Sequence, residues 1–314
     1  MKIKTGMGHR IRIRAVILVV LALLLMLSAF SGCVDQSLTD PQNSADPVQV
    51  STSAVQDTQP PQSQNNDTTD EKIQIIHAAG EVRDEDGTVY YGANSYEGLE
   101  LCYNAGHRYV EIDFNFTSDG TLACIHGWYK NFSEKITANV PLSRDEYMQC
   151  RIFGHFTPMC LDTLAEFLKE HPDLYIVTDI KDRNVDGARK IAETYPELVG
   201  QFIVQIYQKE EYEQVRELGY ENIILTLYKL SNAEKTDVPA LVEFAHSHPL
   251  FGIAFAAVLA DYDGFVSGLS QSGTQLFVHT VNGEQTCKKY YDMGINGVYT
   301  DYRADSENVP EEVQ

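Results

Sequence analysis

The stretch that decides the fold runs from residue 109 to residue 128 and reads YVEIDFNFTSDGTLACIHGW. It begins as an apolar strand that carries two carboxylates, Glu111 and Asp113, passes through a polar turn, and returns as a second apolar run that ends at His126. Successive side chains of a strand alternate between its faces, so Glu111 and Asp113 point the same way. Two acids and a histidine at neighbouring strand ends add nothing to a folding core. The stretch therefore predicts a functional site.

From Lys72 onward, short apolar runs alternate with segments of helical periodicity. The strand candidates are Ile73 to His77, Tyr109 to Phe114, Leu122 to His126, Leu174 to Lys181, Phe202 to Ile206, Asn222 to Tyr228, Gly252 to Ala257, Leu276 to Val281 and Gly297 to Thr300. The helix candidates include Ser95 to Gly106, Leu161 to Glu170, Asp186 to Tyr195, Glu210 to Leu218 and Val238 to His246. This alternation predicts an α/β fold, and so many strands in about 235 residues favour a closed (β/α)8 TIM barrel.

The turn from Thr117 to Gly120 interrupts this regular pattern. It is too short to hold a crossover helix, and nine strand candidates compete for the eight places of a barrel. We therefore expect the barrel to be irregular between its second and third strands.

The first 32 residues have the form of a secretory signal. A basic flank precedes an apolar run from Ala15 to Phe30, which is shorter than the roughly 20 residues of a membrane span. The small residues before Cys33 resemble the lipobox of bacterial lipoproteins. We expect residues 1–32 to be removed and Cys33 to be lipidated, which places the protein outside the cytoplasm on the cell membrane. An uncleaved anchor helix is the alternative, and it leads to the same place.

Three further regions follow from composition. Residues 33–71 are expected to form a disordered linker, because Val34 to Glu71 contains no Lys, Arg or aromatic residue. Residues 72–304 form the barrel domain, and 305–314 an acidic tail. The net charge is −21, and five of the 24 Lys and Arg residues lie in the signal. A surface this acidic repels polyanions, which excludes nucleic acid as a partner.

Five cysteines remain in the barrel domain: Cys102, Cys124, Cys150, Cys160 and Cys287. An odd number in an exported protein leaves at least one thiol free. Cys150 and Cys160 are the one pair close enough in sequence to make a disulfide plausible, and the sequence leaves its formation open. No spacing of these residues suggests zinc.

Ionisable residues stand at the ends of four consecutive strand candidates, and active sites of such barrels lie at the C-terminal ends of the strands. In chain order they are His77, then Glu111 and Asp113, then His126, then Asp179 and Lys181. Three carboxylates without a cysteine suggest one hard divalent cation, Mg²⁺ or Ca²⁺. Two histidines can act as general acid and base, and a lysine can offset the charge of a phosphate. The set suits the hydrolysis of a phosphodiester.

The motifs around these residues resemble those of the glycerophosphodiester phosphodiesterase family, within the superfamily that includes the phosphatidylinositol-specific phospholipases C. In chain order the motifs are Ile75 to Gly80, Glu111 to Asp113 with Thr117 to Gly120, Ile125-His126, Asp179 to Lys181, His279 to Asn282 and Gly297 to Asp301. Each motif is weak alone, but their order and spacing together are specific. The chain looks like an exported bacterial member of lipoprotein type.

The resemblance implies a role for each site residue. His77 and His126 would be the acid and base pair, and the metal ligands would be Glu111, Asp113 and Asp179, with Asp179 in the place of the usual Glu. The residues implied for substrate binding are Lys181, which would face the phosphate, and Asn94, Trp128 and His279. The ring of His279 is an alternative extra proton carrier, and Trp128 has the alternative of packing on the barrel rim.

Three departures from the family pattern stand out. His-Arg-Gly reads His77-Ala78-Ala79-Gly80 here, and Glu-Asn reads Ala93-Asn94. His-Asp reads His126-Gly127, so a carboxylate able to orient His126 is missing. The expected substrate is a glycerophosphodiester or a related lipid-headgroup phosphodiester. The alternatives are a metal-independent, phospholipase C-like cleavage through a cyclic phosphate and a non-catalytic binding module on a degenerate barrel.

Overall fold

A computed structural model describes residues 72–137 and 139–303. Four predictions lie outside the described residues. They are the signal of residues 1–32, the lipidated Cys33, the linker of residues 33–71 and the acidic tail of residues 305–314. Among the described residues, no helix is long and apolar enough to cross a bilayer.

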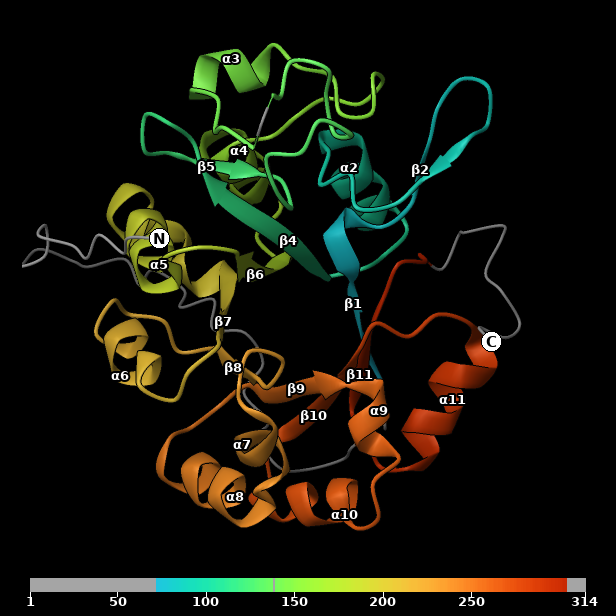
Figure 1. The fold of residues 1–314 in the computed structure, drawn as a ribbon, viewed down its shortest axis with the longest axis vertical. Coiled ribbons are helices and arrows are strands. Elements are labelled where there is room, and N and C mark those ends of the chain that lie inside the picture. Colours follow the sequence, from blue (N-terminus) through green and yellow to red (C-terminus); the bar gives the residue numbers. More distant parts are fainter. Residues whose placement is uncertain (1–71, 138, 304–314) are drawn as a thin grey trace, which may run out of the picture. The chain divides into compact units, whose positions relative to one another are not determined.

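Eight parallel strands form a closed barrel (Figure 1). Around the barrel they are β1 (Ile73–Ile76), β4 (Tyr109–Phe116), β6 (Tyr175–Ile180), β7 (Phe202–Ile206), β8 (Ile223–Thr226), β9 (Gly252–Ala256), β10 (Gln275–His279) and β11 (Gly297–Thr300). The barrel closes because β1 pairs with β11 on one side and with β4 on the other. The predicted (β/α)8 barrel is confirmed, and every predicted strand run contains a strand.

The ninth strand run lies outside this ring. β5 (Leu122–Cys124) pairs antiparallel with β4, so that Phe114 faces Cys124 and Phe116 faces Leu122. A turn of four or five residues can join only antiparallel neighbours, because a parallel connection must travel the length of the sheet. The expected irregularity after the second barrel strand is therefore a hairpin. β5 ends at Cys124, so His126 follows the antiparallel strand of this hairpin and does not stand at the end of one of the eight barrel strands.

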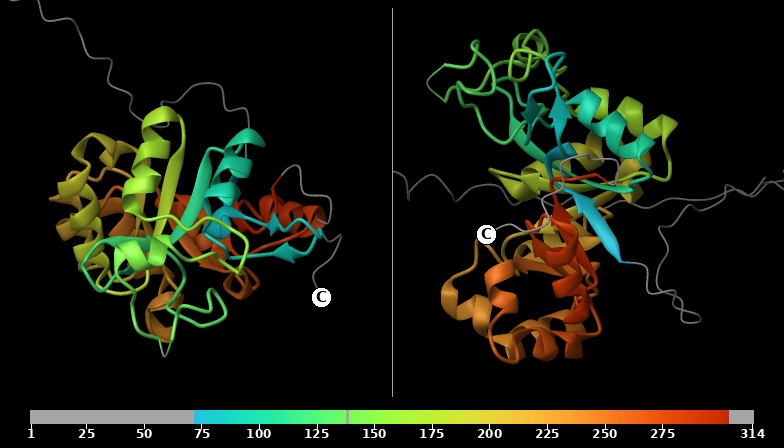
Figure 2. Two further views of the ribbon diagram at one scale, coloured as in Figure 1. Left: turned by 90° about the horizontal axis from the view of Figure 1, so that it is seen from above. Right: turned by 90° about the vertical axis from the view of Figure 1, so that its right-hand side faces the viewer.

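The helices lie outside the barrel wall, as the two views of Figure 2 show. The longer ones are α2 (Tyr96–Asn104), α4 (Leu161–Glu170), α5 (Asn184–Thr194), α6 (Glu211–Arg216), α8 (Val238–Ser247) and α11 (Glu284–Asp292). The short helices are α3 (Arg144–Met148), α7 (Asn232–Thr236), α9 (Ala257–Ala260) and α10 (Phe265–Leu269), with 3-10 turns η1 (His77–Ala79), η2 (Pro196–Gln201) and η3 (Ser270–Ser272). β2 (Val82–Arg83) and β3 (Val89–Tyr90) form a separate two-stranded antiparallel sheet between β1 and α2 in the chain.

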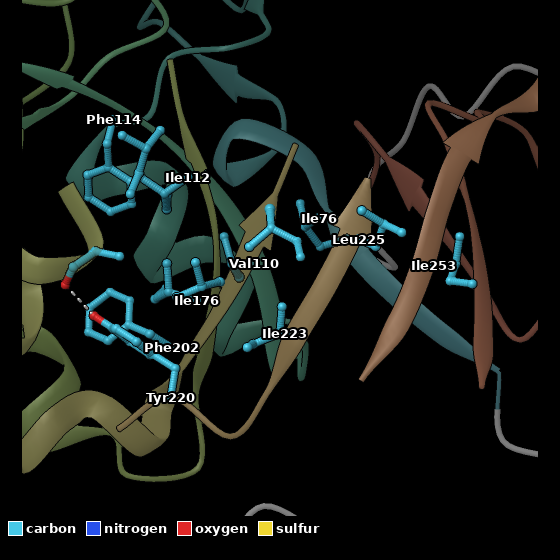
Figure 3. Close-up of a cluster of buried hydrophobic side chains, with 14 of the residues drawn as sticks. Ile76, Val110, Ile112, Phe114, Ile176, Phe202, Tyr220, Ile223, Leu225 and Ile253 are labelled. Atoms are coloured by element: carbon cyan, nitrogen blue, oxygen red, sulfur yellow. Dashed lines mark hydrogen bonds between the residues drawn. The ribbon is translucent and has the colours of Figure 1, made fainter. Parts of the chain in front are cut away.

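The largest part of the core lies between the barrel wall and the helices. Figure 3 shows how side chains of β4, β6, β7 and β8 such as Val110, Ile176 and Ile223 pack there. Tyr220 is fully buried and donates its hydroxyl to the carbonyl of Ala188 at 2.8 Å, which satisfies its one polar atom. A second set of apolar side chains, including Val177 and Phe277, fills the inside of the barrel.

The five cysteines among the described residues are buried and form no disulfide with one another. The backbone of Cys160 forms an isolated antiparallel β-bridge with Ala123 of β5, and Cys150 lies shortly after α3. The Cys150–Cys160 disulfide that the sequence left open is not formed.

Candidate active site

Three carboxylates converge at the mouth of the barrel. Glu111 and Asp113 come from β4 and Asp179 from β6, where Asp113 and Asp179 are direct neighbours in the strand register. Each offers one oxygen within 4.8 Å of the other two. Ligand oxygens at 2.3–2.6 Å from one Ca²⁺ are at most about 5 Å apart, so this spacing fits a single cation. Glu111 Oε1 is buried and has no hydrogen-bond partner in the described chain, which leaves it free to bind one.

Glu111 is held by the backbone of η1. Its Oε2 accepts a hydrogen bond of 2.7 Å from the amide of Ala78. Ala78 and Ala79 both have left-handed φ angles, 49° and 61°, and this unusual turn directs the Ala78 amide toward β4. Burial, with a smaller contribution from the charge of Asp113, raises the pKa of Glu111 to about 8. Without a cation, Glu111 therefore holds a proton at neutral pH.

Lys181 places its ammonium between the other two acids. The Nζ atom lies 2.5 Å from Asp113 Oδ1 and 2.6 Å from Asp179 Oδ2. Burial acts to lower the pKa of Lys181, but Asp113 and Asp179 outweigh it and raise that pKa well above its usual range. Lys181 therefore stays charged, and a cation would share these carboxylates with it.

Two tyrosines that the sequence analysis missed hold Asp179. The hydroxyl groups of Tyr207 and Tyr228 both donate to Asp179 Oδ1, the second at 3.2 Å. Burial acts to raise the pKa of Asp179, but Lys181 lowers it to below its ordinary value, so this acid remains ionised. Lys229 lies over the ring of Tyr207 at 3.5 Å from its centroid. Tyr207 directly follows β7 and Tyr228 lies two residues after β8, so the C-terminal ends of these strands were the available signal for both.

His77 is oriented by Asp301, which the sequence analysis placed in a family motif without giving it a role in the site. Its Nδ1 lies 2.8 Å from Asp301 Oδ1, and Asp301 Oδ2 accepts 2.7 Å from the side chain of Asn282. Nε2 is left facing Glu111 Oε2 at 3.9 Å. Burial acts to lower the pKa of His77, but the bond to Asp301 and the charge of Glu111 raise it to about 9. Barrel closure was the available signal, because Ile76 pairs with Thr300 and the next residues are His77 and Asp301.

Asn94 supports a candidate metal ligand and has no group left for substrate. Its Nδ2 donates to Asp113 Oδ2 at 2.8 Å, and its Oδ1 accepts from the amide of Asp113 at 2.9 Å. The side chain is fully buried. Its prediction as a substrate contact is therefore corrected to a role in orienting Asp113.

The prediction that Trp128 contacts substrate is also corrected. It is 6% exposed, its indole N–H donates to the carbonyl of Phe116 at 3.1 Å, and its ring packs edge-on against Tyr147. These contacts belong to the apolar cluster under the long segment between β5 and α4. Of the two readings of Trp128, packing is the one the structure shows.

His126 lies next to the site but outside its hydrogen-bond network. The Ile125 amide donates to the Asp113 carbonyl at 2.9 Å, so the chain passes close to β4. The side chain of His126 is exposed, and its ring centroid lies 6.3 Å from that of Tyr129. Within the described chain, no hydrogen bond or ion pair joins it to the three carboxylates. A Cβ atom at Gly127 would lie 2.4 Å from the Tyr129 ring, so the missing acid has no room without movement of Tyr129.

A cavity of about 70 Å³ opens among these groups. Its lining includes His77, Glu111, Asp179, Thr226 and His279. Thr226 Oγ1 and His279 Nε2 are buried without a hydrogen-bond partner among the described residues. Burial, with a smaller effect from His77, lowers the pKa of His279 to about 4, so its ring is neutral. The cavity thus combines charged groups on one side with neutral hydrogen-bonding groups on the other.

Stability without metal is expected to fall as pH rises from about 6.5 to about 9. The folded-state pKa of His77 lies above its unfolded value, so its contribution is complete below 6.5 and is lost as pH passes through about 9. Urea unfolding in EDTA at several pH values across this range measures how steeply the free energy of unfolding falls with pH. Asp301→Asn should make this fall shallower, because His77 then loses the partner that raises its pKa, and the part due to the raised pKa of Glu111 should remain. An unchanged slope in Asp301→Asn would contradict the His77–Asp301 coupling.

A closed barrel with acids, a lysine and an oriented histidine at its mouth has the form of a phosphate-ester hydrolase. The sequence model of the glycerophosphoryl diester phosphodiesterase family matches residues 87–304, and the chain belongs to that family. It is a phosphoric diester hydrolase, as the motifs predicted. YhdW of Bacillus subtilis, which is named for the same activity, is 23% identical over 234 residues, covering 68% of this chain and 90% of that protein.

Solved structures share the fold at low sequence identity. A glycerophosphodiester phosphodiesterase from Parabacteroides distasonis has a TM-score of 0.58 and 18% identity, covering 74% of this chain and 94% of its own. A phosphodiesterase from Oleispira antarctica, solved with its product sn-glycerol-3-phosphate, has a TM-score of 0.55 and 16% identity, covering 74% and 93%. These likenesses extend over most of the barrel domain.

Proposed function

We propose that the protein hydrolyses a glycerophosphodiester, or a related headgroup phosphodiester, with one divalent cation, Mg²⁺ or Ca²⁺. The observation that carries this proposal is the meeting of Glu111, Asp113 and Asp179 within 4.8 Å beside the oriented His77. When bound, the cation supplies Lewis-acid polarisation of the phosphoryl group. Glu111, Asp113 and Asp179 would hold it. Lys181 offsets the negative charge of the phosphate.

His77 is the proposed proton donor to the leaving alkoxide. The raised pKa keeps the ring protonated at neutral pH, and Asp301 on Nδ1 directs the Nε2 proton to the cavity. His126 is the proposed second proton carrier, supported by its position directly after Ile125, whose amide is bonded to Asp113. General acid and base groups contribute about 10²–10⁴-fold to rate.

The glycerol end of the substrate is proposed to occupy the 70 Å³ cavity. Thr226 Oγ1 and the neutral His279 Nε2 are the unpaired groups able to bond its hydroxyls. The product complex of the Oleispira antarctica relative supports glycerol phosphate as the kind of product.

Activity of the full chain on glycerophosphoethanolamine, with and without EDTA, tests the proposed function. The expected result is release of ethanolamine and glycerol phosphate that stops with EDTA and returns with Mg²⁺ or Ca²⁺. Cyclic glycerol phosphate as the product, or full activity in EDTA, would favour the metal-independent, phospholipase C-like alternative. Calorimetric binding without turnover would favour a binding module.

Two histidine variants separate proton transfer from substrate binding. His126→Gln is expected to lower kcat about 10²-fold or more with little change in KM, because it removes a proton carrier. His279→Gln is expected to raise KM with a smaller effect on kcat, because a neutral hydrogen-bonding group is lost. Steady-state kinetics on one substrate measures both. The reverse pattern would exchange the two proposed roles.

We also propose that the protein acts outside the cytoplasm, anchored to the cell membrane by lipidated Cys33. The basic and apolar segments before Cys33 support this location. Cys33→Ser is expected to abolish incorporation of a labelled fatty acid and to change the membrane association measured by fractionation. Labelling that persists in Cys33→Ser would contradict the lipid anchor.

A further inference from the structure

A second cavity, of about 500 Å³, is lined by the long segment between β5 and α4 and by Tyr90 of β3. Its residues come from three stretches of chain: Tyr90 of β3, residues 130–135, and residues 149–154. It shares no lining residue with the catalytic cavity. The two cavities are therefore separate places on the molecule.

The charge of this cavity is opposite to that of the protein. Lys130, Lys135 and Arg151 line it, against one carboxylate, Glu134. These are three of the 19 Lys and Arg residues between positions 72 and 303, in a chain whose net charge is −21. None of the three is in an ion pair within the described ranges. Lys135 is fixed by a bond of 2.8 Å to the carbonyl of Gln149, which positions its ammonium without neutralising it.

One wall of the cavity is aromatic. The ring of Phe153 stacks on Tyr90 at 5.2 Å and lies 5.4 Å from Phe132. Phe153 has a left-handed backbone with φ 53°, a conformation rare for a bulky side chain, and its amide donates to the Phe132 carbonyl at 2.8 Å. That strained turn directs the ring against the other two. Strain of this kind is concentrated at functional positions.

We propose that this cavity is a second ligand site that binds a phosphate monoester with a flat, apolar group. Lysine and arginine bind phosphate through charge-assisted hydrogen bonds, and the aromatic wall packs against the flat group. The proposal does not depend on the catalytic function, because the two cavities share no residue. A site of about 500 Å³ is large enough for such a ligand.

Titration calorimetry of the full chain with 1-naphthyl phosphate tests the proposal. One equivalent is expected to bind, with inorganic phosphate and 1-naphthol each binding at least tenfold more weakly. Arg151→Glu is expected to raise Kd at least tenfold. Arg189→Glu, at an arginine of α5 that is also exposed, is the matched control and should leave Kd unchanged.

Phe153→Asn removes the ring while keeping a residue that tolerates the left-handed backbone. This variant should bind 1-naphthyl phosphate no more tightly than inorganic phosphate. Lys181→Met, in the catalytic site, should leave binding intact. Absence of binding, binding unchanged by Arg151→Glu, or binding lost in Lys181→Met would each overturn the proposal. Circular dichroism of each variant establishes that the fold is retained. Loss of catalysis in Lys181→Met, with naphthyl phosphate still bound, separates this site from the catalytic one.

Discussion

His77→Gln is expected to lower kcat by about 10³-fold with little change in KM, because a general acid typically contributes 10²–10⁴-fold. Glutamine keeps a polar side chain of similar reach, so the fold and the bond to Asp301 can persist while the transferable proton is lost. Steady-state hydrolysis of glycerophosphoethanolamine at saturating metal measures the effect. Activity within tenfold of the wild type would remove His77 from the chemistry.

The matched variant for this result is Asp301→Asn. Because the bond to Asp301 raises the pKa of His77, its loss should move the alkaline limb of the kcat profile to lower pH. A residue that only stabilised the fold would lower the amount of active enzyme without moving that limb. The shift in pH therefore distinguishes a positioning role from a structural one.

The strand and helix pattern was predictable because it is local. Short apolar runs such as Ile73–Ile76 and Phe202–Ile206 are recognised from neighbours in the chain alone, and those strands lie where the sequence predicted them. The ninth run was also recognised, but its direction depends on what it pairs with. The shortness of the turn at 117–121 was the one local indication that β5 runs antiparallel to β4.

The part of the site that stands at the C-terminal ends of the barrel strands was predictable, because these ends meet at one edge of the barrel. Glu111, Asp113 and Asp179 follow from that rule and lie together. The roles of Asn94 and Trp128 do not follow from this rule, because the bonds that these side chains form depend on contacts with distant segments. The contact of Asp301 with His77, in contrast, could have been predicted. Its contact with His77 follows from closing the ring, since the last strand of a closed barrel is the neighbour of the first.

Binding of Mg²⁺ or Ca²⁺ at pH 7 is expected to release close to one proton. Burial raises the pKa of Glu111 to about 8, so this carboxyl is mostly protonated in the metal-free site and must lose its proton to become a ligand. Affinity should then rise about tenfold per pH unit below 8 and level off above it. Calorimetry in buffers of different ionisation enthalpy measures the released proton directly.

Glu111→Gln tests this coupling, because glutamine has the same shape without the acid group. This variant should weaken cation binding by about 100-fold or more. It should also remove the proton release and the dependence of cation affinity on pH below 8. Glu100→Gln, on the exposed face of α2, is the matched control and should behave as the wild type. Lys181 already lies against Asp113 and Asp179, so Glu111 is the one candidate ligand of the three that does not contact this ammonium. Proton release that persisted in Glu111→Gln would therefore show that another group titrates, and Glu111 would lose its place as the proton-coupled ligand.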